Sequence, residues 1–296
     1  MKTVGVIGLG IMGSAMSANL VKNGFRVYGY DVLAARRDAL KKAGGIPCKS
    51  VAEVAAKAKI IITSLPSAEA LNSVVRKISS KNKIVVETST LPIADKVKAE
   101  GVLRKRKSIL LDCPLSGTGA QARTGDLVVY GSGEKSTFSK TASTLKGFSR
   151  AQYYVGEFGN GSKMKFVANL MVAIHNVSAA EAFALGIKAG LSPKAIYDVQ
   201  ANSAGSSRMF QVRGPMMVAG RYTDVTMSNR LWQKDMKIIG DFAAQLGVAT
   251  PLFNASAAIY HAAMSQGYAE QDTGAVCAVM EGLAGIRRNA RRKKHG

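Results

Sequence analysis

The chain has 296 residues, of which 47% are hydrophobic and 20% charged, so it fits about two ordinary globular domains of roughly 150 residues each. Its 41 Lys and Arg residues outnumber its 19 Asp and Glu residues, and the net charge of +22 favours anionic partners such as dinucleotides, carboxylates or nucleic acid. Three widely separated cysteines (Cys48, Cys113 and Cys277) form no Cys-x-x-Cys pair. This spacing excludes a disulfide or zinc framework and predicts a reducing, cytoplasmic setting with no metal site.

Residues 1–158 alternate short apolar runs with helical patterns, which is typical of βαβ units and a parallel sheet. The first apolar run is interrupted by glycines and has no small-residue cleavage pattern, so it predicts a strand and a helix instead of a secretion signal. We expect helices at Met12–Lys22 and Ala34–Lys42. The expected strands are Val4–Gly8, Arg26–Tyr30, Ile60–Ser64, Ile84–Glu87, Ile109–Asp112 and Leu127–Tyr130. Together these elements predict an N-terminal, doubly wound α/β domain of the Rossmann type.

A glycine-rich turn follows the first predicted strand and consists of Gly8, Leu9, Gly10, Ile11, Met12 and Gly13. In such a turn the first glycine permits the sharp bend, the second lets a pyrophosphate approach the backbone, and the third allows close helix–strand packing. Asp31 ends the second strand about 20 residues later, where an acid binds ribose hydroxyls and repels a 2′-phosphate. The pattern predicts NAD as cofactor, with NADP possible because Arg36 and Arg37 lie close in sequence. A glycine turn without a cofactor is the alternative.

A second candidate loop follows the fifth predicted strand and contains Ser116, Gly117 and Thr118. Ligands of open α/β sheets bind beyond the carboxyl ends of the strands. Backbone N–H groups and hydroxyls at these positions are suited to hold a substrate carboxylate. Serine, glycine and threonine are also common turn residues, so a purely structural loop is the alternative.

One long helix is predicted over 159–189. Gly190 suits the position after a helix end, and Ser192-Pro193 suits the start of the next helix. The apolar stretch within it is interrupted by polar residues such as His175 and Glu181, which favours a buried helix over a membrane span. We expect His175 to be a packed interior or interface histidine.

Lys165 and Asn169 lie near the start of this predicted helix. Residues four apart share a helix face and are about 6 Å apart along the axis, so both head groups can reach one small substrate. A nicotinamide cofactor needs a group that moves the hydroxyl proton, and Lys165 is the best candidate. An ordinary exposed lysine is the alternative.

The remaining chain predicts an all-α domain over 190–286, since it shows helical periodicity without strand alternation. Residues 287–296 carry the basic residues Arg287, Arg288, Arg291, Arg292, Lys293 and Lys294. A charge run at a terminus predicts a solvated tail, with polyanion binding as the alternative. The expected organisation is a dinucleotide-binding domain (1–158), an interdomain helix (159–189), an all-α substrate and oligomerisation domain (190–286) and a basic tail (287–296).

Four blocks, in this order, resemble the β-hydroxyacid dehydrogenase family, which includes 3-hydroxyisobutyrate dehydrogenases and tartronate semialdehyde reductases. They are Gly8–Leu20, Asp112–Leu127, Gly159–Asn169 and Lys234-Asp235-Met236. The resemblance implies that Lys165 is the general acid/base, that Asn169 hydrogen-bonds the substrate, and that Lys234 lies near nicotinamide and substrate. It also implies that the second block holds the substrate carboxylate and that Leu65, Pro66 and Thr90 belong to further cofactor loops.

This chain departs from the family pattern in its second block, where Leu115 and Gly117-Thr118-Gly119 replace a valine and paired glycines, so Thr118 and Gln121 alter the expected pocket. The segment Tyr197–Phe210 is more similar to the L-threonate dehydrogenase branch. Within it, Arg208 is a candidate for binding a polar or anionic substrate tail, and a surface salt bridge is the alternative.

These observations predict an oxidoreductase that transfers a hydride between NAD and a small 3-hydroxy acid or its semialdehyde. A lysine has a reference pKa of about 10.4, so a basic role near neutral pH requires a lowered value. An imine reductase-like enzyme and a non-enzymatic, nucleic-acid-associated module of the same fold are the alternatives. The expected partners are a small carboxylic acid and further copies of the chain, as a homodimer or homotetramer. We expect no membrane partner and no nucleic-acid partner.

Overall fold

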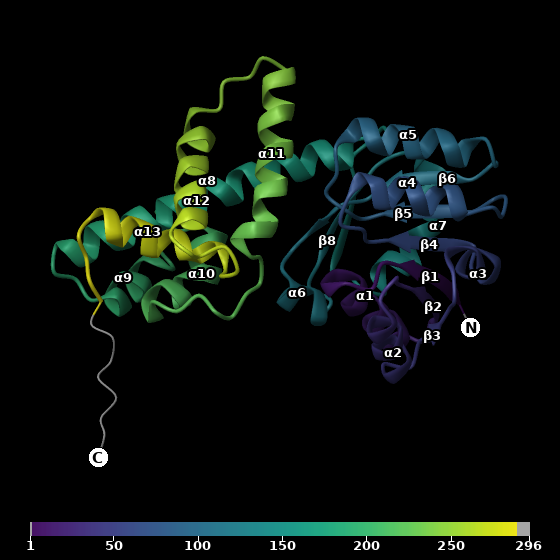
Figure 1. Cartoon of the computed structure of the whole chain (residues 1–296), viewed down its shortest axis with the longest axis horizontal. Coiled ribbons are helices and arrows are strands. Elements are labelled where there is room, and N and C mark those ends of the chain that lie inside the picture. The colour runs from purple at the N-terminus through teal and green to yellow at the C-terminus, as the bar shows by residue number, and fades with distance from the viewer. Residues whose placement is uncertain (1, 289–296) are drawn as a thin grey trace. The chain divides into compact units, whose positions relative to one another are not determined.

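The computed structural model describes residues 2–288, which form two compact units, divided between Val167 and Ala168. The first unit is an α/β structure and the second is helical (Figure 1). Helix α8 (Asn160–Lys188) begins in the first unit and continues into the second. The predicted fold class, a Rossmann-type domain followed by a long helix and an all-α domain, is confirmed.

The sheet of the first unit has six parallel strands in the order β3-β2-β1-β4-β5-β6. Their bounds are β1 Thr3–Ile7, β2 Arg26–Tyr30, β3 Ile46–Pro47, β4 Ile60–Thr63, β5 Ile84–Glu87 and β6 Ile109–Asp112. The direction of winding reverses between β1 and β4. Ligands of open α/β sheets bind at such a switch point, beyond the carboxyl ends of the strands.

Helices cover both faces of this sheet and bury two separate apolar layers. The helices are α1 Ile11–Lys22, α2 Ala34–Lys42, α3 Val51–Lys57, α4 Ala68–Lys77 and α5 Ile93–Arg104. Neighbouring residues of a strand point to opposite faces. In β4, Ile62 therefore packs in the layer with Met16 of α1, whereas Ile61 packs in the layer with Leu71 of α4. Both layers are fully buried, which explains the continuous apolar runs of the sequence.

A second, three-stranded sheet contains β7 Leu115–Ser116, β8 Val128–Gly131 and β9 Ala151–Tyr154, with α6 (Gly119–Arg123) and α7 (Lys135–Lys146) between them. The prediction that the apolar run Leu127–Tyr130 continues the parallel sheet was wrong, because β8 pairs with β7 and β9 instead. Strands β3, β7 and β9 were not predicted. Two of them have only 2 residues, and β9 is partly exposed, so none has a continuous apolar run.

Helix α8 ends as the sequence predicts. Gly190 adopts a left-handed φ of 91°, and the Leu191 N–H donates to the Gly186 carbonyl at 2.9 Å, which is the Schellman arrangement. The next helix starts with the Ser192 hydroxyl accepting from the Ala195 N–H. By length and composition α8 is the one helix among residues 2–288 that could cross a membrane, a weak indication because core helices of soluble proteins pass the same test.

The expectation that α8 is buried holds for only part of its surface. Four of its large apolar side chains are exposed: Met164 at 42%, Val167 at 55%, Met171 at 50% and Leu185 at 74%. Asn169 and Asn176 are buried, and each makes a hydrogen bond within the second unit, to Asp235 and Tyr260 respectively.

The second unit has helices α9 Pro193–Gln200, α10 Arg208–Ala219, α11 Asn229–Gln245, α12 Pro251–Ser265 and α13 Val276–Leu283, with a short 3₁₀ helix η1 (Thr273–Ala275) before α13. Its core contains a row of stacked rings, Tyr197, Phe210 and Phe183, with centroids 5.9 Å and 5.5 Å apart. No strand was predicted here, and in the described part of this unit the β pairing is a single bridge, between Ser228 and Asp272.

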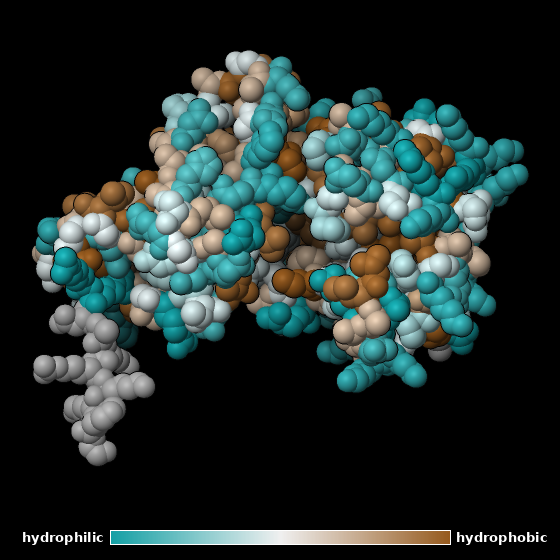
Figure 2. All heavy atoms as spheres, viewed as in Figure 1, coloured by the Kyte–Doolittle hydropathy of each residue, from teal (hydrophilic) through white to brown (hydrophobic). Residues whose placement is uncertain are grey.

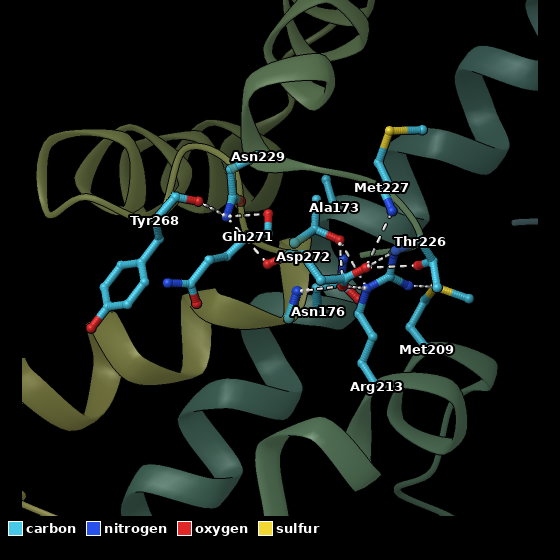
Figure 3. Close-up of polar contacts among 12 residues, drawn as sticks. Ala173, Asn176, Met209, Arg213, Thr226, Met227, Asn229, Tyr268, Gln271 and Asp272 are labelled. Carbon is cyan, nitrogen blue, oxygen red and sulfur yellow. Dashed lines mark hydrogen bonds and ion pairs between the residues drawn. The ribbon is translucent and has the colours of Figure 1, made fainter. Parts of the chain in front are cut away.

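A buried polar cluster lies at the centre of the second unit (Figure 3). The Arg213 Nε of α10 donates to Asp272 Oδ1 at 3.0 Å. The other carboxylate oxygen accepts from the Thr226 N–H and hydroxyl and from the Met227 N–H. Burial alone would raise the Asp272 pKa, but the charge of Arg213 and the hydrogen bonds from Gly274 and Thr226 outweigh it, and the pKa is lowered.

The predicted solvated tail is wrong at Arg288, the last described residue. Its guanidinium pairs with the buried Glu281 and donates to the Val218 carbonyl at 2.8 Å, so this part of the chain is held against α13 and α10. Arg291, Arg292, Lys293 and Lys294 lie outside the described residues.

Candidate active site

The glycine-rich turn lies between β1 and α1, at the carboxyl edge of the sheet. Gly8 has a φ of 89°, and a Cβ there would lie 2.1 Å from the Ser64 carbonyl oxygen. A Cβ on Gly13 would lie 1.8 Å from the Gly8 carbonyl oxygen. At Gly10 the nearest atom to an added Cβ is Arg36 Nη1 at 3.9 Å. The chain itself therefore requires Gly8 and Gly13 but leaves open space over Gly10, as the approach of a phosphate to the backbone requires.

The N-terminus of α1 has no side-chain cap, and an uncapped helix N-terminus offers N–H groups and a positive dipole end to an anion. Exposed apolar side chains lie beside this turn, namely Ile11 (63%), Val32 (79%) and Leu33 (52%). Figure 2 shows hydrophobic residues on the surface in the region of α1. An anion-binding backbone next to exposed apolar side chains suits a dinucleotide, which has both phosphates and a flat base.

Asp31 is buried directly after β2, where the sequence predicts the ribose-binding acid. Its Oδ2 accepts from the Leu9 N–H at 2.8 Å and its Oδ1 from the Leu33 N–H at 2.9 Å, while Arg36 pairs with it at 3.3 Å. Burial alone would raise its pKa, but the hydrogen bonds from Leu33, Leu9 and Arg36 outweigh it, and the pKa is lowered. A full negative charge therefore stays beside the glycine turn at neutral pH.

The further predicted cofactor residues follow the next two strands along the sheet. Leu65 and Pro66 lie just after β4, and Thr90 lies just after β5. The Leu65 N–H donates to the Ser89 hydroxyl at 2.8 Å, which links these two loops directly. The structure thus brings the predicted cofactor residues Gly8–Gly13, Asp31, Leu65, Pro66 and Thr90 to one edge of the sheet.

The predicted carboxylate loop lies at β7 and the start of α6. Thr118 caps α6 through a capping box, in which its hydroxyl accepts from the Gln121 N–H and its own N–H donates to the Gln121 side chain at 3.0 Å. The Gln121 side chain in turn donates to Asp126 at 3.0 Å. Ser116 is partly buried and Gly117 is exposed with a φ of 135°. Thr118 and Gln121, the residues expected to alter the pocket, thus form a helix cap in this loop.

Lys165 is partly buried on α8, one turn after Ser162. That first turn is fixed to the sheet, since the Ser162 N–H and hydroxyl donate to the Asp112 carboxylate at 2.7 and 2.8 Å. Asn169 lies one turn beyond Lys165, on the same helix face.

Asn169 and Lys234 are linked through a residue to which the sequence assigns no role. The Asn169 Nδ2 donates to Asp235 Oδ2 at 3.0 Å, and Lys234 Nζ lies 3.4 Å from Asp235 Oδ1. This contact fixes the amide orientation, so the Asn169 carbonyl oxygen is directed away from Asp235. Asp235 belongs to the same sequence block as Lys234, but spacing alone does not reveal it as a buried partner of Asn169.

Arg208 and His175 lie elsewhere in the second unit. Arg208 is exposed at the start of α10, and its guanidinium donates to Gln211 on the same helix at 3.4 Å. Its role in substrate binding stays a prediction. His175 lines an open cavity of about 340 Å³ with Ser178, Gln200 and Ser207. No group of three or more potential metal ligands occurs within residues 2–288.

The sequence was compared with models of known protein families and with characterised proteins. Residues 3–156 match the model of the NAD binding domain of 6-phosphogluconate dehydrogenase, and residues 159–280 match that of the NAD-binding domain of NADP-dependent 3-hydroxyisobutyrate dehydrogenase. The L-threonate dehydrogenase of Cupriavidus necator is 30% identical over 289 residues, which cover 95% of this chain and 97% of that protein. The chain belongs to the β-hydroxyacid dehydrogenase family.

Comparison with solved structures supports the same family. A 3-hydroxyisobutyrate dehydrogenase from Salmonella typhimurium superimposes with a TM-score of 0.85 at 27% identity, covering 94% of this chain and 100% of that one. An imine reductase from Streptomyces aurantiacus gives a TM-score of 0.63 at 20% identity over 94% and 99% of the chains, which is a likeness of fold alone. This β-hydroxyacid dehydrogenase is therefore an NAD(P)-dependent oxidoreductase, and the imine reductase alternative is the weaker one.

Proposed function

We propose that this β-hydroxyacid dehydrogenase oxidises a small 3-hydroxy acid, or reduces the matching semialdehyde, with Lys165 as general acid/base. The arrangement around α8 supports this assignment best. Lys165 and Asn169 share one face of the helix, and Asn169 is held by Asp235, the neighbour of Lys234. One cationic donor and one oriented amide, a turn apart, suit a hydroxyl or carbonyl oxygen as ligand.

In the oxidation direction, neutral Lys165 accepts the proton of the substrate hydroxyl, and in reduction protonated Lys165 returns it to the forming alkoxide. Asn169 orients that oxygen, and Ser116, Gly117 and Thr118 bind the substrate carboxylate. When bound, NAD supplies the hydride acceptor and NADH the donor. General acid–base catalysis contributes about 10² to 10⁴ in rate.

The turn at Gly8–Gly13 fits such a cofactor, since the space over Gly10 is open and α1 is uncapped. We assign NAD as the preferred form because the charged, buried Asp31 carboxylate repels a 2′-phosphate. Arg36 is the basic residue nearest to accommodate NADP, but it is paired with Asp31. Leu65, Pro66, Thr90 and Lys234 complete the proposed cofactor contacts.

For the substrate we propose a short polyhydroxylated acid of the threonate type. The support is the similarity to the enzyme of Cupriavidus necator, named an L-threonate dehydrogenase, over nearly the whole chain. The exposed Arg208 is the candidate for contact with the distal hydroxyl groups. A shorter hydroxyacid without such groups is the second candidate.

The test is nicotinamide reduction by the purified protein with L-threonate, 3-hydroxyisobutyrate and glycerate, each with NAD and NADP. Lys165→Ala should lose about 10² to 10⁴ in kcat while binding NAD normally. Lys163→Ala is the matched control, because Lys163 is an exposed lysine of the same helix turn. Near-normal turnover of Lys165→Ala would rule out the assigned proton transfer.

We further propose a cytoplasmic homodimer or homotetramer that associates through α8. Val167 and Leu185 are five turns apart, Met171 is one turn after Val167 and Met164 is three residues before it, so the four exposed side chains form one apolar stripe. Lys165 lies about 200° around the helix from Val167, so association leaves the proposed catalytic face free. Sedimentation of Leu185→Glu against the exposed control Leu246→Glu measures this, with dissociation expected for the first variant only.

A further inference from the structure

A fully buried lysine lies at the carboxyl edge of the sheet, close to the residues of the proposed reaction. Lys96 of α5 is 0% exposed, and its ammonium lies 2.7 Å from Glu87 Oε2 and 2.8 Å from Asp112 Oδ1. It also donates to the Ser89 carbonyl at 2.7 Å. Burial alone would lower the Lys96 pKa, but the two carboxylates outweigh it and the pKa is raised.

This cluster has two carboxylates and one ammonium, so one negative charge needs further partners. Those partners come from the start of α8. The Ser162 N–H donates to Asp112 Oδ2 at 2.7 Å, and the Ser162 hydroxyl donates to Oδ1 at 2.8 Å. The Gly161 N–H donates to the Ser132 hydroxyl, which is directed at Asp112, 3.1 Å from its backbone carbonyl oxygen and 3.2 Å from Oδ2. Asp112 therefore satisfies the Ser162 N–H, one of the groups that a helix start leaves unpaired, and its charge faces the positive end of the helix dipole.

Close backbone packing holds the same helix turn. A Cβ on Gly161 would lie 2.4 Å from the Tyr130 carbonyl oxygen and 2.6 Å from that of Asp112. The start of α8 thus has little freedom to slide over β6 and β8. Lys165 follows Ser162 by three residues, about 4.5 Å along the helix axis.

The cluster also joins the loops assigned to cofactor and substrate. Through the Ser89 carbonyl, Lys96 holds the loop of Thr90, and the Ser89 hydroxyl accepts from the Leu65 N–H. Asp112 begins the segment that leads to Ser116. One buried ammonium is therefore bonded to the ends of β5 and β6 and, through Asp112, to α8.

We propose that Lys96 and Asp112 are positioning residues, which hold the first turn of α8 and thereby set Lys165 against the loops that follow β4, β5 and β6. This rests on the proposed function, in which Lys165 moves the proton. A buried ion cluster contributes little net stability compared with apolar residues of the same volume. Its directional bonds to three loops and a helix, however, fix their relative positions, which apolar packing alone cannot do. A displacement of about 1 Å can cost a reaction roughly 100-fold in rate.

The test is Ser162→Ala, which removes one bond between α8 and Asp112 and leaves every charge in place. The matched control is Ser108→Ala, because Ser108 is also buried and its hydroxyl accepts from the Lys83 N–H and donates to the Arg106 carbonyl, at the opposite end of β6. For each variant we would measure kcat, KM, the NAD dissociation constant, thermal unfolding, and hydrogen exchange of amides 163–167 without ligands.

For Ser162→Ala we expect faster exchange at 163–167, a fall in kcat of about 10-fold or more, NAD binding within about twofold of wild type, and thermal unfolding close to that of Ser108→Ala. Ser108→Ala should keep kcat and the exchange of α8. Unchanged exchange would overturn the anchoring role, and faster exchange with unchanged kcat would overturn the positioning role. If the wild-type protein had no lysine-dependent turnover, the proposed function would fail instead, and exchange alone would decide whether the cluster anchors α8.

A second variant tests the charge itself. Asp112→Asn keeps the volume but leaves only one acceptor oxygen for Lys96, Ser132 and Ser162. We expect a larger fall in kcat than for Ser162→Ala, together with faster exchange at 163–167. A smaller effect than that of Ser162→Ala would contradict the central place of Asp112, and if this variant does not fold, Ser162→Ala still decides.

Discussion

At the residue scale, Gly10 and Gly13 are both glycines, but for different physical reasons. A Cβ at Gly13 would meet the Gly8 carbonyl oxygen at 1.8 Å, whereas at Gly10 it would meet nothing closer than 3.9 Å. Gly13→Ala should therefore destabilise the protein by several kcal/mol, because the added methyl group would overlap the backbone and force it to shift. Gly10→Ala should fold normally, because its φ of −68° suits alanine, but weaken NAD binding roughly 10-fold or more.

Thermal unfolding and calorimetric titration with NAD separate these two effects. Gly101→Ala is the control, since an added Cβ there has no neighbour within 4 Å and the residue lies inside α5. Normal NAD affinity in a folded Gly10→Ala variant would place the pyrophosphate elsewhere.

Asp31 determines the cofactor preference in the proposed site. In Asp31→Asn the buried charge is lost and Arg36 loses its ionic partner. The kcat/KM value for NADP should therefore rise relative to that for NAD. Hydrogen bonds to charged groups contribute about 1.5 to 3 kcal/mol, so the ratio of kcat/KM values for NAD and NADP should fall by roughly 10- to 100-fold. Asp38→Asn removes the same charge from an exposed position of α2 and should leave the ratio unchanged. Equal ratios in both variants would mean that Asp31 does not select the cofactor.

At the scale of elements, the sequence predicts those segments whose local chemistry is decisive. The continuous apolar run of β4 and the Gly190 and Ser192-Pro193 signals around α9 lie where they were expected. Strand β9 could not be predicted, because the partner strand β8 determines it and its own Ala-Gln-Tyr-Tyr sequence is not apolar. Lys96 gave no signal either. In sequence it is an ordinary helical lysine, and only the fold brings Glu87 and Asp112 to it.

The Arg213–Asp272 pair joins α10 to the segment before α13, and both side chains are buried. Asp272→Asn should lower the free energy of unfolding by about 3 to 5 kcal/mol, because it leaves Arg213 without its counter-charge. The exposed pair Arg221–Asp224 provides the control, and Asp224→Asn should cost at most about 1 kcal/mol. Urea unfolding of the three proteins measures the difference, and equal midpoints would contradict the importance of this cluster.

The same carboxylate makes stability depend on pH. Its pKa is lowered in the folded state, so its contribution is present above the unfolded value of about 3.9 and is lost as pH falls through the folded value. Wild-type stability should therefore decrease below about pH 4 more steeply than that of Asp272→Asn. Parallel curves of unfolding free energy from pH 6 to pH 3 would exclude this source of acid sensitivity.

At the scale of the whole molecule, some of the basic residues lie where helix dipoles favour a positive charge. Basic residues occupy the last turn of the first five helices, whereas acidic residues occupy the first turn of α3, α4 and α5. The acids thus lie at the carboxyl edge of the sheet and the bases at the opposite edge. This placement explains part of the +22 charge through helix stability, without a nucleic-acid partner.

The division into two units has a consequence for ligand binding. The residues proposed to bind NAD are nearly all in the first unit, whereas Asn169, Asp235 and Lys234 are in the second. NAD at about 100 times its dissociation constant should stabilise the folded protein by about 2.7 kcal/mol. Hydrogen exchange should then slow around Gly8–Gly13 and the loops after β4 and β5. The Arg213–Asp272 cluster should not change, because its amides are already held by protein partners.

Adding a non-reacting substrate analogue, such as a short carboxylic acid without the 3-hydroxyl, should extend this protection to Asn169 and its neighbours on α8. Gly10→Ala is the control, because its weaker NAD binding should reduce the NAD-dependent change in the first unit while leaving the starting exchange pattern intact. If NAD alone slowed exchange equally in both units, cofactor binding would involve the second unit beyond Lys234. The proposal that NAD binds mainly to the first unit and the substrate to the second would then be wrong. The proposed catalytic role of Lys165 would not be affected.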